Sequence, residues 1–112
     1  MQRGDVWMVA LPFSGGREQS GERPAVVIQD TAYGQGSPLV LIVLLTSQLA
    51  ALRFPASVRV EPTLSNGLNL PSVAMVFQTR ALDRSRFLRR IGAVTDEALS
   101  SILSELDQLT GR

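Results

Sequence analysis

The chain has 112 residues, a net charge of +1 and 45% hydrophobic residues. This length predicts one domain over residues 1–112 with a single hydrophobic core. Cysteine and histidine are absent, which excludes disulfides, thiolate nucleophiles and the commonest zinc ligands, so we expect neither a metal nor another cofactor. The apolar runs are shorter than the about 20 residues that span a bilayer, and no export-signal pattern is present. These features indicate a cytoplasmic protein without a membrane segment.

Six apolar segments with the alternation or composition of β-strands follow one another along the chain. Proline, glycine and asparagine punctuate the intervals between them. The segments are residues 5–11, 24–29, 39–45, 56–61, 72–77 and 88–94. Residues 79–82 can continue the fifth segment past a bend, Gly92 interrupts the sixth, and residues 49–52 suit either one helical turn or a loop. The polar, glycine-rich stretch at 14–21 is typical of a hairpin loop.

The last segment of the chain changes to a helical period. From Leu99 to Leu109, apolar residues recur at spacings of three and four and form one face of an amphipathic helix. Thr95 is placed to cap its N-terminus, and Asp96 and Glu97 then lie in the first turn, where carboxylates meet the positive end of the helix dipole. Five or six short strands followed by one helix predict a mainly β fold, a small antiparallel barrel packed by the C-terminal helix.

Polar groups stand at the ends of two predicted strands. Arg23 directly precedes the apolar run that begins at Pro24, and the run from Leu39 to Leu45 ends in Thr46, Ser47 and Gln48. An arginine can hold a phosphate through two parallel N–H donors, and a neighbouring hydroxyl can complete the contact. Arg23 and Thr46 are therefore candidates for a phosphodiester site.

Both polar groups also have ordinary structural interpretations. Arg23 can pair with Glu18 or Glu22 on the surface, and such exposed ion pairs contribute little to stability. The sequence from Thr46 to Gln48 can be only a strand-ending turn, because hydroxyl and amide side chains often stabilise turns. Taken alone, the residue types leave these alternatives open.

Four motifs, in this order and spacing, carry a resemblance to a known family. They are Arg3–Trp7, Gly16–Pro24, Leu45–Gln48 and Gln78–Asp83. The chain resembles the MazF/PemK toxins, the ribonuclease arms of bacterial toxin–antitoxin pairs. The resemblance implies an SH3-like antiparallel β-barrel of the CcdB/PemK/MazF type with a C-terminal α-helix. It also implies a homodimer, metal-independent cleavage of single-stranded RNA, including mRNA, at short sequence motifs, and an antitoxin that masks the RNA groove. A first strand that is apolar on both faces favours the homodimer as well.

The resemblance implies roles for individual residues. Arg23 becomes the catalytic arginine and Thr46 its hydroxyl partner in a reaction where the ribose 2′-OH attacks the adjacent phosphorus, leaving a 2′,3′-cyclic phosphate and a 5′-OH. A guanidinium stays protonated far above neutral pH and is therefore a poor base, so electrostatic stabilisation suits Arg23 better than proton abstraction. A further set of polar residues is expected to bind RNA and set the sequence preference. This set comprises Arg17, Glu18, Gln19, Ser47, Gln48, Gln78 and Arg80.

The chain departs from the family pattern at two positions, and two other functions compete with RNA cleavage. Phe77 stands where relatives often carry an acidic residue, and Arg17 replaces a small residue, which affects the expected cleavage motif. One competitor is a gyrase poison of the CcdB type, but those proteins depend on a C-terminal Trp-Gly-Ile, which this chain lacks. The other is a non-catalytic SH3-like module that binds RNA or peptide, and a cyclic-phosphate product would distinguish the enzyme from it.

Overall fold

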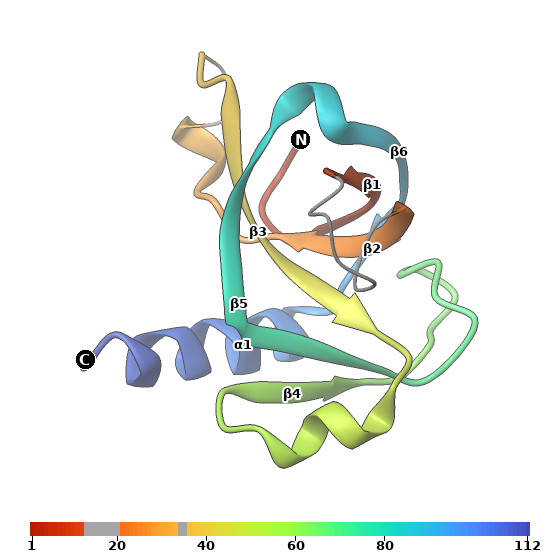
Figure 1. Cartoon of the computed structure of the whole chain (residues 1–112), viewed down its shortest axis with the longest axis vertical. Helices are drawn as coiled ribbons and strands as arrows, with labels where there is room; N and C mark the ends of the chain where they lie inside the picture. Colours follow the sequence, from red (N-terminus) through yellow and green to blue (C-terminus); the bar gives the residue numbers. More distant parts are fainter. Residues whose placement is uncertain (13–20, 34–35) are drawn as a thin grey trace.

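A computed structural model of the chain describes residues 1–12, 21–33 and 36–112. Within these ranges, six strands form one antiparallel sheet and an α-helix follows the last strand (Figure 1). The strands are β1 (Asp5–Leu11), β2 (Gly21–Val27), β3 (Leu39–Thr46), β4 (Ser57–Val60), β5 (Ser72–Asp83) and β6 (Phe87–Ala93), and the helix is α1 (Asp96–Leu109). Three short 3-10 helices lie between strands: η1 (Thr31–Tyr33), η2 (Leu49–Arg53) and η3 (Arg84–Arg86).

The predicted elements are confirmed, with differences at their ends and at one glycine. Strand β2 begins at Gly21, three residues before Pro24, and the segment that suited a helical turn or a loop is the 3-10 helix η2. The expected interruption of the last strand at Gly92 is wrong for the strand itself, because β6 continues through this residue and pairs it with Val6 of β1. The ladder is irregular in the next step, where its register shifts and Trp7 pairs with Arg90.

Strand β5 bends as its sequence suggested. Leu44 of β3 lies opposite Met75, whereas Ile42, only two residues away, lies opposite Arg80. The extra residues of β5 between these two pairs form an irregular step, where the Thr79 hydroxyl donates to the Val76 carbonyl at 2.7 Å. The bend turns the second half of β5 away from β4, so that β5 pairs with β4 through its first half alone.

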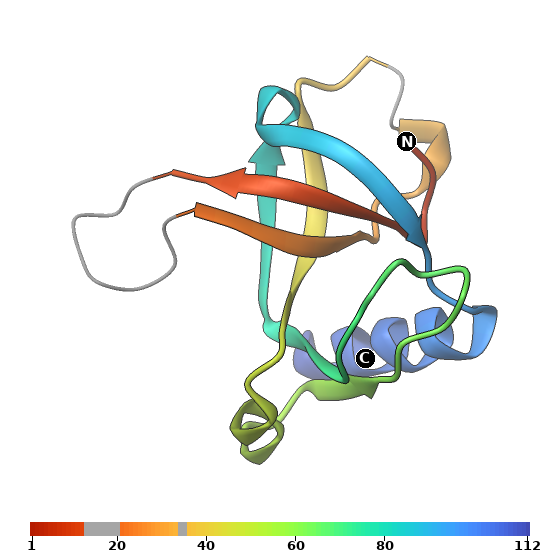
Figure 2. The same cartoon turned by 90° about the vertical axis from the view of Figure 1, so that its right-hand side faces the viewer.

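The sheet has the strand order β4-β5-β3-β2-β1-β6 and is strongly coiled. Figure 2 shows β1, β2 and β6 crossing β3 and β5 at a steep angle, so the two halves of the sheet enclose a core between them. Among the described residues, no ladder joins the edge strands β4 and β6. The expected mainly β fold with a C-terminal helix is confirmed, and its barrel-like sheet is not closed by hydrogen bonds.

Two apolar clusters occupy the two faces of this sheet because successive strand residues point to opposite sides. The cluster named here the helix-side cluster includes Val26, Val43 and Leu45. The cluster on the other face, named the inner cluster, is built from residues of β1, β2, β3 and β5. Its buried members are Val9, Leu11, Ala25, Val27, Val40, Ile42, Leu44, Val73, Met75 and Leu82.

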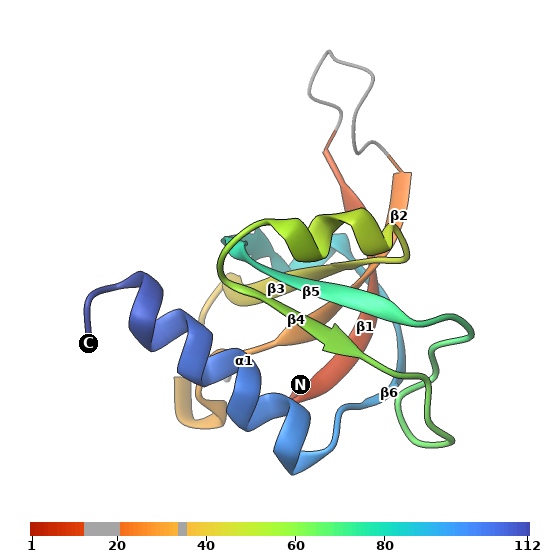
Figure 3. The same ribbon diagram turned by 90° about the horizontal axis from the view of Figure 1, so that it is seen from below.

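Helix α1 covers the helix-side cluster by lying across β4 and the first half of β5 (Figure 3). Its Ile102 is completely buried there. The Thr95 hydroxyl accepts a hydrogen bond from the Ala98 amide at 3.1 Å, and Asp96 and Glu97 occupy the first turn. The predicted cap and first turn are thus confirmed. Within the described ranges, neither α1 nor any other helix has the length and hydropathy to cross a bilayer.

Candidate functional site

An open pocket of about 330 Å³ lies where β2 begins and β3 ends. Two of its walls are the ends of these strands, and the third is the connection between β4 and β5. The lining residues are Glu22, Arg23, Pro24, Leu45, Thr46, Ser47, Leu68, Asn69, Leu70 and Ser72. The pocket therefore brings together the two residues that the sequence singled out for a phosphodiester site.

The register of β2 and β3 explains why Arg23 and Thr46 meet. Ala25 pairs with Leu44 and Val27 with Ile42, and Arg23 and Thr46 each lie two residues beyond the last pair of this ladder. Residues two apart on a strand point to the same face of the sheet. Alternation along each strand places both side chains on the face of the inner cluster, at its open end.

Thr46 is held in place by burial and by a turn. Only 6% of the residue is exposed, and its Oγ1 atom accepts a hydrogen bond from the backbone N–H of Gln48 at 3.1 Å. The structural interpretation of this segment as a strand-ending turn is therefore correct. This turn leaves the hydroxyl free to donate, because a threonine hydroxyl that accepts one hydrogen bond can still donate its own hydrogen to a ligand.

Arg23 is half-buried, and its side chain makes no hydrogen bond or ion pair with any residue in the described ranges. Glu22, one of its two expected partners, instead pairs across the sheet with Arg89 of β6, with 3.5 Å between Arg89 Nη1 and Glu22 Oε1. Glu18, the other expected partner, lies outside the described residues. Because no carboxylate of the described residues pairs with Arg23, its charge is available among them for an anion in the pocket.

The third wall of the pocket is a tightly built loop, residues 61–71, named here the β4–β5 loop. Asn66 is 2% exposed and fixes the loop from inside, because its Oδ1 accepts from the amides of Thr63 and Leu68, each at 3.0 Å, and its Nδ2 donates to the Glu61 carbonyl at 2.9 Å. The Ser65 carbonyl accepts from the Ala93 amide of β6 at 2.8 Å. These contacts fix the loop both to itself and to β6.

Two glycines permit the loop to lie directly on β6. A Cβ atom on Gly92 would stand 2.3 Å from the Ser65 carbonyl oxygen, and one on Gly67 would stand 2.2 Å from the Ile91 carbonyl oxygen. Gly67 also has a φ of +73°, a conformation that side chains disfavour. Backbone therefore packs on backbone here, and the position of the pocket wall is set by β6.

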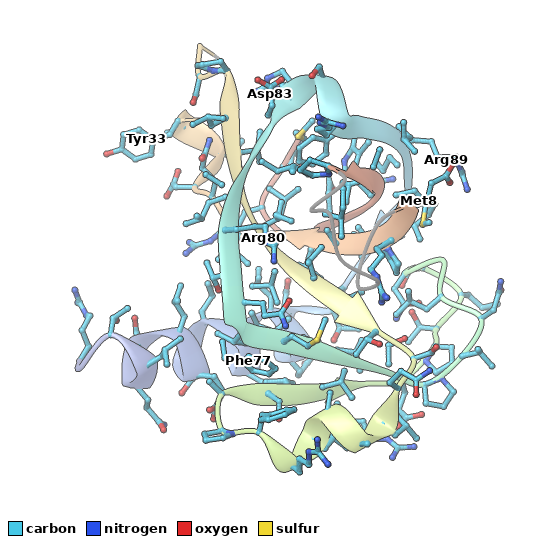
Figure 4. All side chains as sticks on the ribbon, in the orientation of Figure 1. Met8, Tyr33, Phe77, Arg80, Asp83 and Arg89 are labelled. Atoms are coloured by element: carbon cyan, nitrogen blue, oxygen red, sulfur yellow. The ribbon has the colours of Figure 1, made fainter. Side chains whose placement is uncertain are left out.

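The predicted RNA-binding residues do not all gather at the pocket. Ser47 is exposed and lines it, while Gln48 contributes the backbone donor that holds Thr46 and is not a lining residue. Gln78 and Arg80 lie at and beyond the bend of β5, and Figure 4 shows Arg80 halfway along that strand. Arg17, Glu18 and Gln19 lie outside the described residues.

Four residues of the third wall were not anticipated from the sequence: Leu68, Asn69, Leu70 and Ser72. The Asn66-Gly67 pair and Pro71 predicted only a connection between strands. What brings this connection to Thr46 is the pairing of Thr46 with Val73 across β3 and β5, which no local sequence signal specifies. Ser72 is buried, and its hydroxyl donates to the Leu70 carbonyl at 3.0 Å.

The pocket can hold a tetrahedral anion through a guanidinium and a hydroxyl from adjacent strands. In the described ranges, no three histidine, cysteine, aspartate or glutamate side chains lie together in an arrangement that could hold a metal ion. The polar side chains that line this site are therefore one guanidinium, the Glu22 carboxylate that pairs with Arg89, three hydroxyls and one amide.

Comparison with known proteins assigns a family to this fold and pocket. Residues 2–110 match the family described as the PemK-like, MazF-like toxin of type II toxin–antitoxin systems. The chain belongs to this family. The resemblance expected from four short motifs is confirmed, and the chain is a toxin of the MazF endoribonuclease family.

Individual relatives of this toxin agree with the assignment over nearly the whole chain. The endoribonuclease MazF of Staphylococcus saprophyticus is 30% identical over 107 residues, which cover 96% of this chain and 88% of that protein. The crystal structure of MazF from Deinococcus radiodurans matches with a TM-score of 0.81 and 26% identity, covering 100% of this chain and 97% of that one. A crystal structure of MazE–MazF from the same organism matches with a TM-score of 0.79 and 26% identity, covering 99% and 96% of the two chains.

Proposed function

We propose that this toxin is a sequence-specific, metal-independent endoribonuclease that cleaves single-stranded RNA, including mRNA, and thereby inhibits translation and growth. The observation that carries the proposal is that Arg23 and Thr46 line the same open pocket, in a chain of the MazF family. The guanidinium has no carboxylate partner among the described residues, so it is available for the phosphate of a substrate.

The proposed reaction forms one bond and breaks one bond at phosphorus. The ribose 2′-OH attacks the adjacent phosphorus, the bond between phosphorus and the 5′ oxygen breaks, and the products are a 2′,3′-cyclic phosphate and a 5′-OH. The proton lost by the 2′-OH passes to water, and the leaving 5′ oxygen takes one up. Negative charge grows on the non-bridging oxygens in between, and fixed donors aimed at such charge lower the barrier.

Arg23 and Thr46 have different parts in this step. Arg23 stabilises the charge of the pentacoordinate phosphorus through two N–H donors and can protonate the leaving oxygen, but a guanidinium already carries its proton and is unsuited to accept the one from the 2′-OH. Thr46 donates its hydroxyl hydrogen to one non-bridging oxygen, while its lone pair continues to hold the Gln48 amide.

The remaining polar residues bind the RNA strand on either side of the cleaved bond. Ser47 lies in the pocket itself. Arg80 is exposed and pairs with Ile42, four residues before Thr46 on β3, which is about 13 Å along the strand at the usual rise. At that separation Arg80 and Gln78 meet a different nucleotide from the one in the pocket. We assign Gln48, Arg17, Glu18 and Gln19 to RNA contacts as well, on the family pattern alone.

We also infer that the toxin acts in the cytoplasm as a homodimer and that an antitoxin neutralises it. The family name and the MazE–MazF structure from Deinococcus radiodurans support the antitoxin. Large exposed apolar side chains on and beside η2, at Leu49, Leu52 and Phe54, support an interface between copies. Light scattering at micromolar concentration should give twice the mass of the chain, and a monomer would contradict the dimer.

The product ends test the proposed reaction. The purified toxin, incubated with a long single-stranded RNA, should produce fragments with 2′,3′-cyclic phosphate and 5′-OH ends at a recurring short sequence, equally in the presence and absence of EDTA. RNA that is bound but left intact would indicate a non-catalytic module. Fragments with 5′-phosphate ends, or cleavage abolished by EDTA, would indicate a different nuclease chemistry.

A further inference from the structure

The third wall of the pocket carries one side-chain amide, that of Asn69, in the pocket that Arg23 and Thr46 also line. Asn69 lies in the β4–β5 loop, three residues before β5 begins, and lines the pocket. Its side chain is exposed and forms no hydrogen bond with any residue of the described ranges. Asn66, three residues earlier, contrasts with it, because all of its amide contacts are used to build the loop.

The loop holds the backbone that carries this amide at a fixed place. Asn66 fixes the loop from inside, and Gly67 and Gly92 allow the loop backbone to lie on β6 without an intervening side chain. A polar group that is held by its backbone before the ligand arrives loses less conformational freedom on binding, and this favours selectivity.

The surroundings of Asn69 suit a flat, partly apolar ring with a polar edge. Leu68 and Leu70 flank it in the pocket lining, and Leu70 is 59% exposed. At about 330 Å³ the pocket is at the small end of ligand sites, which range from about 300 to 1,000 Å³. It therefore has room for about one nucleotide beside Arg23 and Thr46.

We propose that Asn69 reads the nucleobase that flanks the cleaved phosphate and selects adenine there. An asparagine amide has one acceptor and one donor in the arrangement that matches the Hoogsteen edge of adenine, where it accepts from N6–H and donates to N7, an edge that no other base presents. Single-stranded RNA presents such base edges to proteins because its bases are unpaired. Asn69 is thus a specificity-determining residue for the reaction proposed above, and the inference rests on that reaction.

Two substitutions at Asn69 test the inference, with a matched control in the same loop. Asn69→Ala removes the amide, and Asn69→Asp replaces it by a carboxylate, which only accepts and therefore suits the N4 amino group of cytosine. Leu64→Ala is the control, since Leu64 is fully exposed in the β4–β5 loop and does not line the pocket. Each protein is given a random-sequence RNA library, and the cut ends are sequenced.

The expected result is an adenine preference at one position flanking the cut for the wild type and for Leu64→Ala. Asn69→Ala should reduce this preference by about tenfold or more, the usual worth of a two-bond base contact, and Asn69→Asp should move it toward cytosine. The inference is overturned if Asn69→Ala keeps the wild-type sequence preference, or if the wild type shows no adenine preference beside the cut.

Binding measurements separate failure of this inference from failure of the proposed reaction. Short RNAs carrying a 2′-deoxy sugar at the cut position cannot react, and they can be compared with adenine or another base beside that position. If the wild type cuts no RNA, the proposed reaction fails. In that case, loss of adenine-selective binding in Asn69→Ala still supports base reading by Asn69, and binding that is equal for all bases overturns it.

Discussion

Thr46 links the fold and the proposed chemistry at the scale of one residue. Its Oγ1 atom accepts a hydrogen bond from the Gln48 amide at 3.1 Å, and its hydroxyl donates no hydrogen bond to any residue in the described ranges. A substitution that removes the hydroxyl removes both contacts, so turn stability and reaction rate have to be measured separately.

Thr46→Val and Thr46→Ser separate these contributions. Valine keeps the branched shape and lacks the hydroxyl, so cleavage should slow by about tenfold or more, the worth of a hydrogen bond to a charged group. Serine keeps the hydroxyl and should retain most of the rate. Single-turnover cleavage measures the effect on rate, and urea denaturation should show a loss of about 1 kcal/mol for valine from the missing turn contact. If the Thr46→Val toxin is folded and cleaves at the wild-type rate, Thr46 stabilises the turn but takes no part in the reaction.

The pocket residues differ in how far the sequence could predict them. Arg23 and Thr46 were predictable because both stand where an apolar run meets polar residues, and because family motifs surround them. The ion pair between Glu22 and Arg89 was not predictable, since the two residues are far apart in the chain and meet only because β1 lies between β2 and β6 in the sheet. Asn69 was missed for the same reason, because its approach to Thr46 depends on the pairing of β3 with β5.

At the scale of elements, the contact between the β4–β5 loop and β6 positions the third pocket wall. Gly92→Ala tests this contact. Its Cβ would meet the Ser65 carbonyl oxygen at 2.3 Å and the Asn66 carbonyl carbon at 2.6 Å, and neither backbone atom can move without shifting the loop. The free energy of unfolding should fall by about 1–3 kcal/mol, as for overpacked sites, and RNA cleavage should weaken as the wall moves.

Gly36→Ala is the matched control for this substitution. A Cβ atom on Gly36 would meet nothing within 4 Å, so its urea denaturation midpoint should equal that of the wild type. Equal midpoints for Gly92→Ala and the wild type would show that the loop does not depend on close packing against β6.

The periodicity of the sequence predicted the strands and the helix well. The one wrong expectation about these elements was that Gly92 interrupts its strand. The alternation of apolar residues located the strands, and the spacing of leucines located α1 with its Thr95 cap. Gly92 was expected to interrupt its strand, because glycine weakens strands. In the structure it serves instead as the place where a neighbouring backbone approaches closely, which is visible only once β6 and the loop are both in position.

At the scale of the whole molecule, coiling of the sheet separates the face that α1 covers from the face that ends in the proposed active site. The helix-side face carries α1 and its buried Ile102. The other face carries the inner cluster. At the end of this cluster, the alternation of side chains along β2 and β3 places Arg23 and Thr46 on the same face. The class of fold and its C-terminal helix followed from the sequence, whereas the open edge between β4 and β6 did not, because it depends on how strongly the sheet coils.

The rate at which Arg23→Ala produces 2′,3′-cyclic phosphate ends is the most direct test that this pocket is the active site. Removing a donor aimed at developing negative charge lowers a rate by about 100-fold to 1,000-fold, and we expect a loss of at least this size in a variant with a wild-type denaturation curve. Arg59→Ala is the matched control, because Arg59 is an exposed strand arginine that pairs with Glu61 away from the pocket, and its rate should be unchanged. A folded Arg23→Ala toxin that forms these ends as fast as the wild type would contradict the assignment.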